Sequence, residues 1–127
     1  MTYLSNAPVS PILLSDLRET VGWDRMDAEY GNSALASYYH IAVYDGDKLI
    51  GYIDSVSNGV TDAYIQDLMV HPAYQGQGIG TELMQRMIAV LKERRIYMIS
   101  VIYEERLTGF YRKFGFYQML SGQLNTY

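Results

Sequence analysis

Cysteine is absent from the 127 residues of this chain, and its absence excludes several kinds of chemistry. Without a thiol there is no disulfide framework, no thiolate nucleophile and no cysteine metal site. The two histidines, His40 and His71, lie far apart without the spacing of metal ligands, so we predict no metal site. The G-x-S-x-G signature of a serine nucleophile is also missing. The usual routes to a covalent acyl intermediate are therefore unsupported by the sequence.

Long apolar runs and an excess of basic residues are missing as well. No apolar stretch approaches the roughly 18 residues needed to cross a bilayer, and the first residues lack the basic and apolar regions of a signal peptide. The net charge of −4 leaves no basic stripe that could neutralise nucleic-acid phosphates. We therefore expect neither a membrane nor a nucleic-acid partner, and a cytoplasmic location.

What remains is typical of one folded domain. The chain is 49% hydrophobic and 19% charged, as is usual for globular proteins. Its length is enough to bury a core but small for more than one domain. No linker, repeat or low-complexity segment divides the sequence, so we predict a single domain over residues 1–127.

The most informative stretch is residues 64–91. Residues 64–70 are rich in β-forming side chains and predict a strand, which Pro72 ends because proline cannot donate to a ladder. Apolar residues recur at helical spacing over 79–91 and predict an amphipathic helix. Between the two lie three alternate glycines, Gly76, Gly78 and Gly80. Bare backbone N–H groups at a helix N-terminus, where the dipole is positive, would form a site for phosphate.

The spacing of these glycines narrows the kind of phosphate ligand. A P-loop needs a lysine that is missing here, and a dinucleotide fingerprint needs a third glycine where Thr81 or Leu83 stands. The pattern that fits is Q-x-x-G-x-G, formed by Gln75, Gly78 and Gly80. It resembles the acetyl-CoA pyrophosphate loop of the GNAT family of N-acetyltransferases. A tight turn without a ligand is the alternative interpretation.

A second motif carries the same resemblance. Residues 110–116 read Phe-Tyr-Arg-Lys-Phe-Gly-Phe, which is similar to the family's F-Y-x-K-x-G-F segment near the C-terminus. The two motifs occur in the family's order and cover roughly the second half of the chain. The basic pair Arg112-Lys113 is interpreted as helix-end charge, with a place near the 3′-phosphate of CoA as the alternative.

The resemblance implies an α/β fold with a mixed, mostly antiparallel sheet, helices on both faces and a splayed central pair of parallel strands. The residue pattern predicts the individual elements. Besides the strand at 64–70 and the helix from 79, these are a short edge strand within 1–11, a helix from about Ser15 through Val21, a short helix or loop at 24–30, a hairpin of 39–44 and 49–56, a strand at 96–102, a helix at 107–114 and a final strand at 116–120.

The resemblance also implies acetyl-CoA as co-substrate, with no metal, and places its contacts on the main chain. Backbone groups of Leu68, Met69 and Val70 would bind the acetyl carbonyl and the pantetheine arm. The pyrophosphate would lie on the loop formed by Gln75, Gly76, Gln77, Gly78, Ile79, Gly80 and Thr81.

Tyr111 matches the tyrosine that many family members use to protonate the leaving thiolate, which makes it the predicted catalytic residue. Because the chain has 13 tyrosines, a packing role is the alternative. The general base stays open among Asp67, Glu29, Glu104 and a water chain. Glu104 and Glu105 stand near where the family often has an asparagine, so a cofactor contact there is in doubt.

The predicted function is transfer of an acetyl group to a primary amine by direct attack in a ternary complex. The acceptor, a small-molecule or peptide amine, would enter across residues 23–39, an aromatic and mildly acidic segment that suits a cationic or aromatic amine. The alternative is a non-catalytic or regulatory CoA-binding module of the same fold. A homodimer formed through the apolar segment 116–120 is a further hypothesis.

Overall fold

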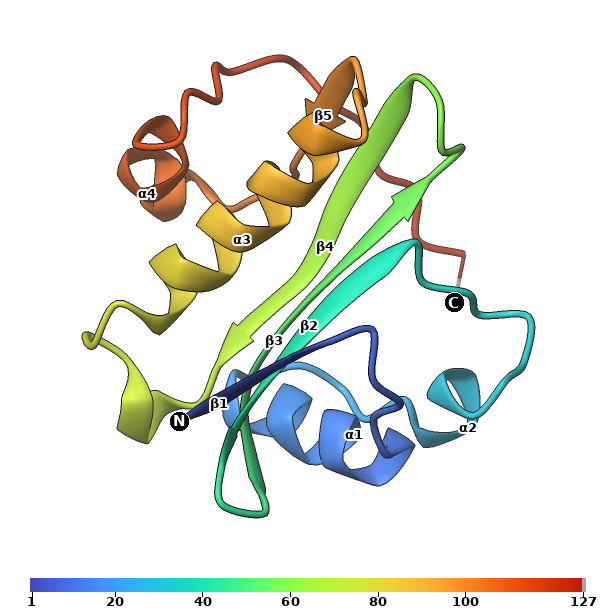
Figure 1. Cartoon of the computed structure of the whole chain (residues 1–127), viewed down its shortest axis with the longest axis vertical. Helices are drawn as coiled ribbons and strands as arrows, with labels where there is room; N and C mark the ends of the chain where they lie inside the picture. The colour runs from blue at the N-terminus through green and yellow to red at the C-terminus, as the bar shows by residue number, and fades with distance from the viewer. Residues whose placement is uncertain (127) are drawn as a thin grey trace.

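The computed structural model describes residues 1–126, and five strands form one sheet in the order β1-β2-β3-β4-β5 (Figure 1). The strands are β1 (Thr2–Ser5), β2 (Tyr39–Asp45), β3 (Lys48–Ser57), β4 (Asp62–Val70) and β5 (Met98–Ser100). All neighbouring strands are antiparallel except β4 and β5, which are parallel. The sheet is therefore mixed and mostly antiparallel, as the sequence predicts.

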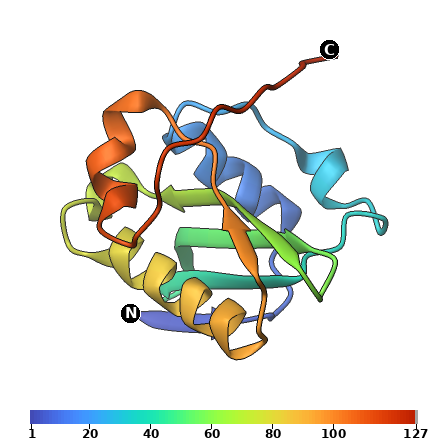
Figure 2. The same ribbon diagram turned by 90° about the horizontal axis from the view of Figure 1, so that it is seen from above.

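Helices cover both faces of this sheet (Figure 2). They are α1 (Pro11–Thr20), α2 (Asp27–Tyr30), α3 (Ile79–Glu93) and α4 (Thr108–Arg112), with single 3₁₀ turns at Pro72–Tyr74 and Glu105–Leu107. Because strand residues alternate between faces, Ile41 and Val43 pack with α3 whereas Ala42 packs with α1. No helix in the described part of the chain is long and apolar enough to cross a membrane.

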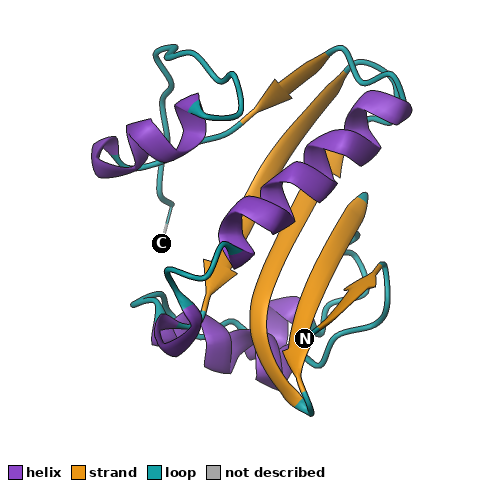
Figure 3. Ribbon diagram, turned by 60° about the vertical axis from the view of Figure 1, so that its left-hand side comes forward, coloured by secondary structure: helices purple, strands orange, loops and turns teal. Residues whose placement is uncertain are grey.

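Helix α3 lies along the sheet (Figure 3) and approaches it closely at Gly51 of β3. A Cβ atom at this position would lie 3.3 Å from the Ile79 Cγ2 and Val43 Cγ2 atoms. Because glycine has no side chain, the first turn of α3 can pack directly against β3. Leu83 and Met87 of α3 are completely buried. Helix α3 starts at Ile79, as the sequence predicts. Residues 75–81, the glycine loop, therefore lie between the end of β4 and the first turn of α3.

Helix α1 begins earlier than predicted. It starts at Pro11, with Ser10 as its N-cap, and the Leu13 N–H donates to the Ser10 Oγ at 3.4 Å. Proline at the first helical position loses no hydrogen bond, and the serine side chain accepts one from an otherwise unpaired N–H. The predicted start near Ser15 is therefore too late. The Ser10 cap and Pro11 mark the start of the helix, whereas the apolar residues mark only its buried face.

The parallel pair separates soon after it forms. Strands β4 and β5 pair only at Asp62–Met98, Ala63–Ile99 and Tyr64–Ser100, whereas β4 continues to Val70 beside β3. From residue 65 onward the other edge of β4 has no ladder partner, which leaves backbone N–H and C=O groups available there. This is the predicted splay. It also explains why β5 is shorter than the predicted 96–102.

The predicted final strand at 116–120 is wrong. Residues 116–126 contain neither helix nor strand, and Tyr117 and Leu120 are 71% and 103% exposed. The segment leaves α4 and crosses toward the α2 side of the sheet instead of running along β5 (Figure 1). A β-like residue pattern produces a strand only where the chain can lie along a neighbouring edge, and this path does not.

Candidate active site

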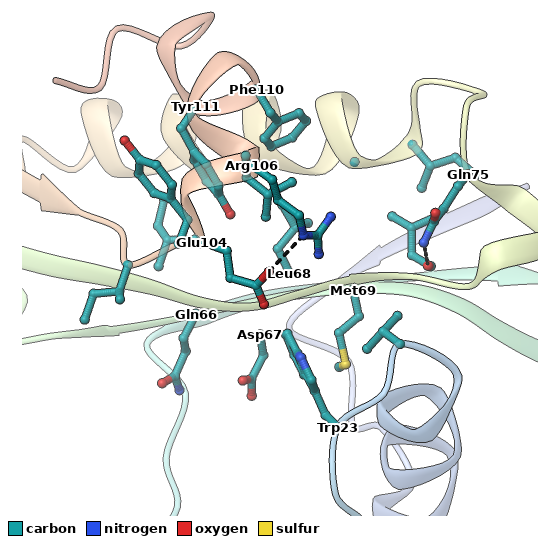
Figure 4. A pocket seen from close by; sticks show the side chains of 18 of the residues that line it. Trp23, Gln66, Asp67, Leu68, Met69, Gln75, Glu104, Arg106, Phe110 and Tyr111 are labelled. Atoms are coloured by element: carbon teal, nitrogen blue, oxygen red, sulfur yellow. Dashed lines mark hydrogen bonds and ion pairs between the residues drawn. The ribbon is translucent and has the colours of Figure 1, made fainter. Parts of the chain in front are cut away.

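A β-bulge interrupts β4 beside the splayed gap. The register advances from Asp54 to Tyr52 on β3 while it advances from Gln66 to Met69 on β4, so β4 carries one extra residue. Asp67 takes a φ of +55°, a left-handed conformation that few residues other than glycine adopt, aspartate among them. The side chains of Gln66 and Asp67 consequently lie on the same side of the strand (Figure 4). The bulge thus turns a carboxylate toward α1 and α2.

The gap opens into a groove of about 1180 Å³. Its walls are the bulged half of β4, the glycine loop, the segment between β5 and α4, and the end of α1 (Figure 4). The predicted site residues that line it are Leu68, Met69, Val70, Gln75, Gly76, Gly78, Ile79, Gly80, Thr81 and Tyr111. Gln77 does not line it. The fold therefore brings both sequence motifs to one groove, while the role of each residue stays a prediction.

The glycine loop has the geometry of an anion site. Gly76 and Gly78 have φ angles of +79° and +82°, conformations that favour glycine. The first hydrogen bond within α3 runs from the Glu82 N–H to the Gly78 carbonyl at 2.9 Å. The N–H groups of Ile79, Gly80 and Thr81 precede it and have no helical acceptor. These donors, at the positive end of a long helix, suit a diphosphate.

The side chain of Gln75 forms a hydrogen bond with the backbone of β4. Its Nε2 donates to the Val70 carbonyl at 2.9 Å. This bond ties the start of the loop to the last residue of β4 and so places the loop relative to the free strand edge. Gln75 accordingly acts on the position of the loop, a role that its place in the motif does not reveal.

Lys113 is a cation that the motifs did not assign to the loop. Its Nζ lies 3.4 Å from the Thr81 Oγ1 and 4.8 Å from the centre of the Phe110 ring. The sequence left open whether the pair Arg112-Lys113 was helix-end charge or a phosphate contact. The structure places Lys113 beside the first turn of α3, where its charge adds to that of the helix end.

Tyr111 lies on the α4 wall of the groove and is 7% exposed. Its ring stacks on Tyr103, with centroids 4.4 Å apart and planes inclined by 18°, and Phe110 contacts it edge-on. Burial raises the pKa of the Tyr111 hydroxyl, and the neighbouring Tyr64 and Tyr103 raise it further. The hydroxyl therefore keeps its proton at neutral pH, which is the state that a proton donor needs.

Asp67 is held on the opposite side of β4 by residues from the first two helices. The Tyr30 hydroxyl donates to the Asp67 Oδ2 at 3.1 Å, and the Arg18 Nη1 lies 3.7 Å from the Asp67 Oδ1. Burial raises the pKa of the Asp67 carboxyl, and it outweighs the lowering by Arg18 and by the Tyr30 hydrogen bond. The side chain still has 22% of its surface exposed, in the groove.

Trp23 is the residue of the predicted acceptor segment 23–39 that lines the groove; Arg18 and Val21 join it from α1. The Arg18 guanidinium lies 5.2 Å from the centre of the Trp23 ring, and its Nε donates to the Asp24 carbonyl at 2.6 Å. Figure 4 shows Trp23 next to Asp67, on the same side of β4. An aromatic face and a carboxylate therefore lie together where an acceptor would enter.

The other two candidate bases are placed differently. Glu104 lines the groove, but its Oε2 accepts from the Arg106 Nε at 2.8 Å and its side chain is 71% exposed. Glu29 is exposed on α2 and does not line the groove. The structure thus brings Asp67 and Glu104 to the site and leaves Glu29 outside it.

Comparison with known proteins identifies the family. Residues 8–116 match the acetyltransferase (GNAT) family. The chain belongs to the GNAT family.

This GNAT chain is 30% identical over 126 residues to the histone acetyltransferase TAP1 of Glycine max, and the match covers 90% of this chain and 54% of that protein. It is 31% identical over 120 residues to the uncharacterized N-acetyltransferase ycf52 of Porphyra purpurea, covering 90% and 69%. It is 34% identical over 108 residues to the chloroplastic serotonin N-acetyltransferase 2 of Oryza sativa, covering 81% and 54%. The chain spans about half the length of the soybean and rice relatives.

Solved structures share the GNAT fold described above. A Staphylococcus aureus protein of unknown function superposes with a TM-score of 0.86 at 22% identity, covering 99% of this chain and 100% of that one. A GNAT family acetyltransferase from Streptococcus pneumoniae gives 0.77 at 30% identity, covering 99% and 98%. An aminoglycoside 6′-N-acetyltransferase complexed with coenzyme A gives 0.64 at 23% identity, covering 80% and 61%.

Proposed function

We propose that this GNAT protein is an acetyl-CoA-dependent N-acetyltransferase that moves the acetyl group to a primary amine by direct attack in a ternary complex. One observation carries the proposal: the unpaired edge of β4 runs into the glycine loop within a single groove. A thioester arm needs backbone partners along its length and an anion site at its diphosphate end. The edge at residues 65–70 would supply the backbone partners, and the N–H groups of 79–81 would supply the anion site.

Acetyl-CoA would be held mainly by backbone. Leu68, Met69 and Val70 lie where β4 has no partner on its gap side, and the loop 75–81 follows directly. When bound, acetyl-CoA supplies an activated acetyl carbon. A backbone N–H at the strand edge would polarise the thioester carbonyl, and fixed positions for both reactants would provide most of the acceleration. The absence of cysteine fits direct attack without an acyl-enzyme.

Tyr111 would protonate the thiolate that leaves. A tyrosine with a pKa near 10 that donates to a thiolate, whose thiol has a pKa near 8.5, works uphill by roughly 2 kcal/mol, and burial makes this step harder still. The hydroxyl therefore helps while the carbon–sulfur bond breaks and charge on the sulfur is greatest, or as a hydrogen bond without complete transfer. Its place inside the groove, and its protonated state, support this role.

The proposal is tested by release of free CoA with a panel of amines. The chain contains no cysteine, so a thiol reagent reports CoA without a protein background. The names of the relatives suggest the panel: a histone-tail peptide, serotonin and an aminoglycoside, with phenethylamine and spermidine added. Amine-dependent CoA release supports the proposal. Tight acetyl-CoA binding in calorimetry without release on any amine would contradict it and favour a non-catalytic binding module.

A further inference from the structure

We propose that Ile102 and Tyr64 close the inner end of the groove and restrict the acyl group on CoA to a short one. A second, apolar groove behind these two residues would receive a longer acyl chain once Ile102 is shortened. This inference rests on the proposed function, in which the thioester arm lies along the free edge of β4. It adds the length of the acyl group to the properties that this site determines.

The direction of the thioester arm follows from the two ends of the gap. The diphosphate would lie at the glycine loop, which follows Val70 at the open end. The other end is closed, because Tyr64 and Ser100 form the last rung of the parallel pair. An arm that enters from the loop along β4 therefore points its acyl group toward Tyr64 and the residues that follow Ser100.

Two grooves meet at this closed end. The groove described above has a volume of about 1180 Å³, and a second groove of about 910 Å³ is lined by β5 and by residues of the 114–121 segment. Three of the described residues line both grooves, and they are Tyr64, Ile102 and Tyr103. These residues consequently form the wall between the space for the thioester and the second groove.

Within this wall, Ile102 is the side chain that can be shortened without changing the support of Tyr111. The Tyr103 ring stacks on the Tyr111 ring with the centroids 4.4 Å apart. Val101 and Tyr103 both pack against the core on the α3 side, whereas Ile102 is 42% exposed. This alternation is that of an extended chain, so Ile102 lies on the side away from the stack.

Tyr64 holds the wall from the β4 side. It pairs with Val56 on one edge and with Ser100 on the other, so its backbone is fixed in the sheet. Burial raises the pKa of the Tyr64 hydroxyl and Asp67 raises it further, so the hydroxyl is neutral at pH 7. Residues 101–103 are in neither helix nor strand. The size of the side chain at position 102 therefore decides whether the wall is closed.

The second groove has the chemistry of a site for an alkyl chain. Among the described residues its lining is mostly apolar, with Lys92 and Glu105 as the charged members. The apolar side chains come from α3, from β5 and from the segment after α4, for example Ile88, Ile99 and Phe116. Each methylene group that passes from water into such a lining gains hydrophobic free energy, so a chain that reaches it should bind more tightly.

The decisive variant is Ile102→Ala, assayed with acetyl-CoA, butyryl-CoA and octanoyl-CoA and the best amine of the panel. In the wild type, kcat/KM should be at least about tenfold lower with octanoyl-CoA than with acetyl-CoA, because the longer chain meets the wall. In Ile102→Ala, the ratio of octanoyl-CoA to acetyl-CoA kcat/KM should rise at least about tenfold. If this variant does not fold, Ile102→Val should raise the butyryl-CoA to acetyl-CoA ratio about threefold.

Two further variants show where the longer chain goes. Val56→Ala shortens a β-branched residue of similar exposure, 48%, that lies opposite Tyr64 and lines neither groove, so its ratio should stay that of the wild type. Ser100 lines only the second groove, next to the wall. Ser100→Glu, added to Ile102→Ala, should cancel the gain, because the chain would meet a carboxylate that it cannot hydrate. A gain that survives this second change overturns the route into the second groove.

Calorimetry without an amine gives a readout that does not depend on turnover. The Kd for octanoyl-CoA relative to acetyl-CoA should fall at least about tenfold from the wild type to Ile102→Ala. Wild-type ratios in Ile102→Ala overturn the inference and leave the second groove to the dimer contact considered for residues 116–120. A wild type that binds and uses octanoyl-CoA as well as acetyl-CoA overturns it too. If the wild type binds acetyl-CoA but releases no CoA with any amine, the proposed function fails and the Kd ratios decide the inference alone.

Discussion

At the scale of single residues, burial raises the pKa of both titratable groups that flank the gap, Tyr111 and Asp67. It raises the pKa of the Tyr111 hydroxyl, which then holds its proton more firmly, and it raises the pKa of the Asp67 carboxyl, which then accepts a proton more readily. Burial thus keeps Tyr111 protonated at neutral pH but makes it a weaker acid, whereas it makes the Asp67 carboxylate a stronger base. The two side chains lie on opposite sides of β4 (Figure 4).

Tyr111→Phe removes only the hydroxyl and keeps the ring that packs against Tyr103 and Phe110. The kcat should fall by something like 10²-fold, with little change in the acetyl-CoA Kd, because the lost interaction acts on the leaving group. Single-turnover kinetics and calorimetry measure the two quantities. Tyr103→Phe, in the stacked neighbour, is the control and should keep kcat. A Tyr111→Phe variant with more than half the wild-type kcat, when chemistry limits the rate, would show that the tyrosine only packs.

Asp67 should also make stability depend on pH. Its folded-state pKa lies above the unfolded value, so ionisation costs more in the folded protein. This cost is absent below the unfolded pKa near 4, grows as pH rises through the folded pKa, and is complete above it. Asp67→Asn should therefore melt at a higher temperature than the wild type at pH 7, and the difference should close as the pH falls to about 4. A variant that melts lower at pH 7 would show that the Arg18 contact outweighs the cost of burial.

At the scale of elements, the end of β4, the glycine loop and α3 act as one unit. Gln75 ties the loop to Val70, and Gly51 lets α3 lie close to β3. The free N–H groups at the start of α3 thereby face the end of the unpaired strand edge. Lys113 reaches the same place from α4 and brings a full charge to it.

Gly78→Val should weaken acetyl-CoA binding at least tenfold, about 1.4 kcal/mol. No protein atom lies within 4 Å of the added Cβ, so the loss comes from the φ of +82° and from a branched side chain over the phosphate donors. Gly46→Val, in the β2–β3 turn, is a matched control with similar strain at φ +59° and open space around it. It should bind acetyl-CoA normally. Equal calorimetric affinities for folded Gly78→Val and the wild type would remove the loop from the cofactor site.

At the scale of the whole molecule, the C-terminal segment is the part least integrated into the fold. Tyr117, Met119 and Leu120 are 71%, 78% and 103% exposed. The segment crosses the mouth of the groove, where Gln123 and Asn125 line it. Apolar side chains gathered on a surface favour association, and this supports the homodimer hypothesis drawn from the same residues.

Sedimentation at tens of micromolar, a roughly chosen working concentration, should show a dimer that the variant Met119→Glu converts to monomer. A carboxylate placed in a self-complementary apolar interface would lose its hydration on association. Val60→Glu replaces a residue that is 71% exposed in the β3–β4 turn and should leave the dimer intact. A wild-type monomer under these conditions would contradict the hypothesis.

Much of the fold follows from local sequence. The hairpin, the strand before Pro72, the glycine loop and the helix from Ile79 all depend on backbone preferences of neighbouring residues, and all were predicted near their observed bounds. The positive φ angles at Gly76 and Gly78 belong to this group, because glycine favours them wherever it stands. Local structure of this kind is enough to recognise the family and its diphosphate loop.

Tertiary structure alone decided the features that complete the site. A bulge arises from the register between two strands, so no local pattern marks Asp67 for a positive φ. Its contacts with Arg18 and Tyr30, like that of Lys113 with Thr81, join residues distant in sequence. The missing strand at 116–120 has the same cause, because strand pairing needs a partner edge that composition cannot supply. The loop proposed to hold the cofactor is thus encoded locally, whereas the proposed acceptor side exists only once β4, α1 and α2 have packed together.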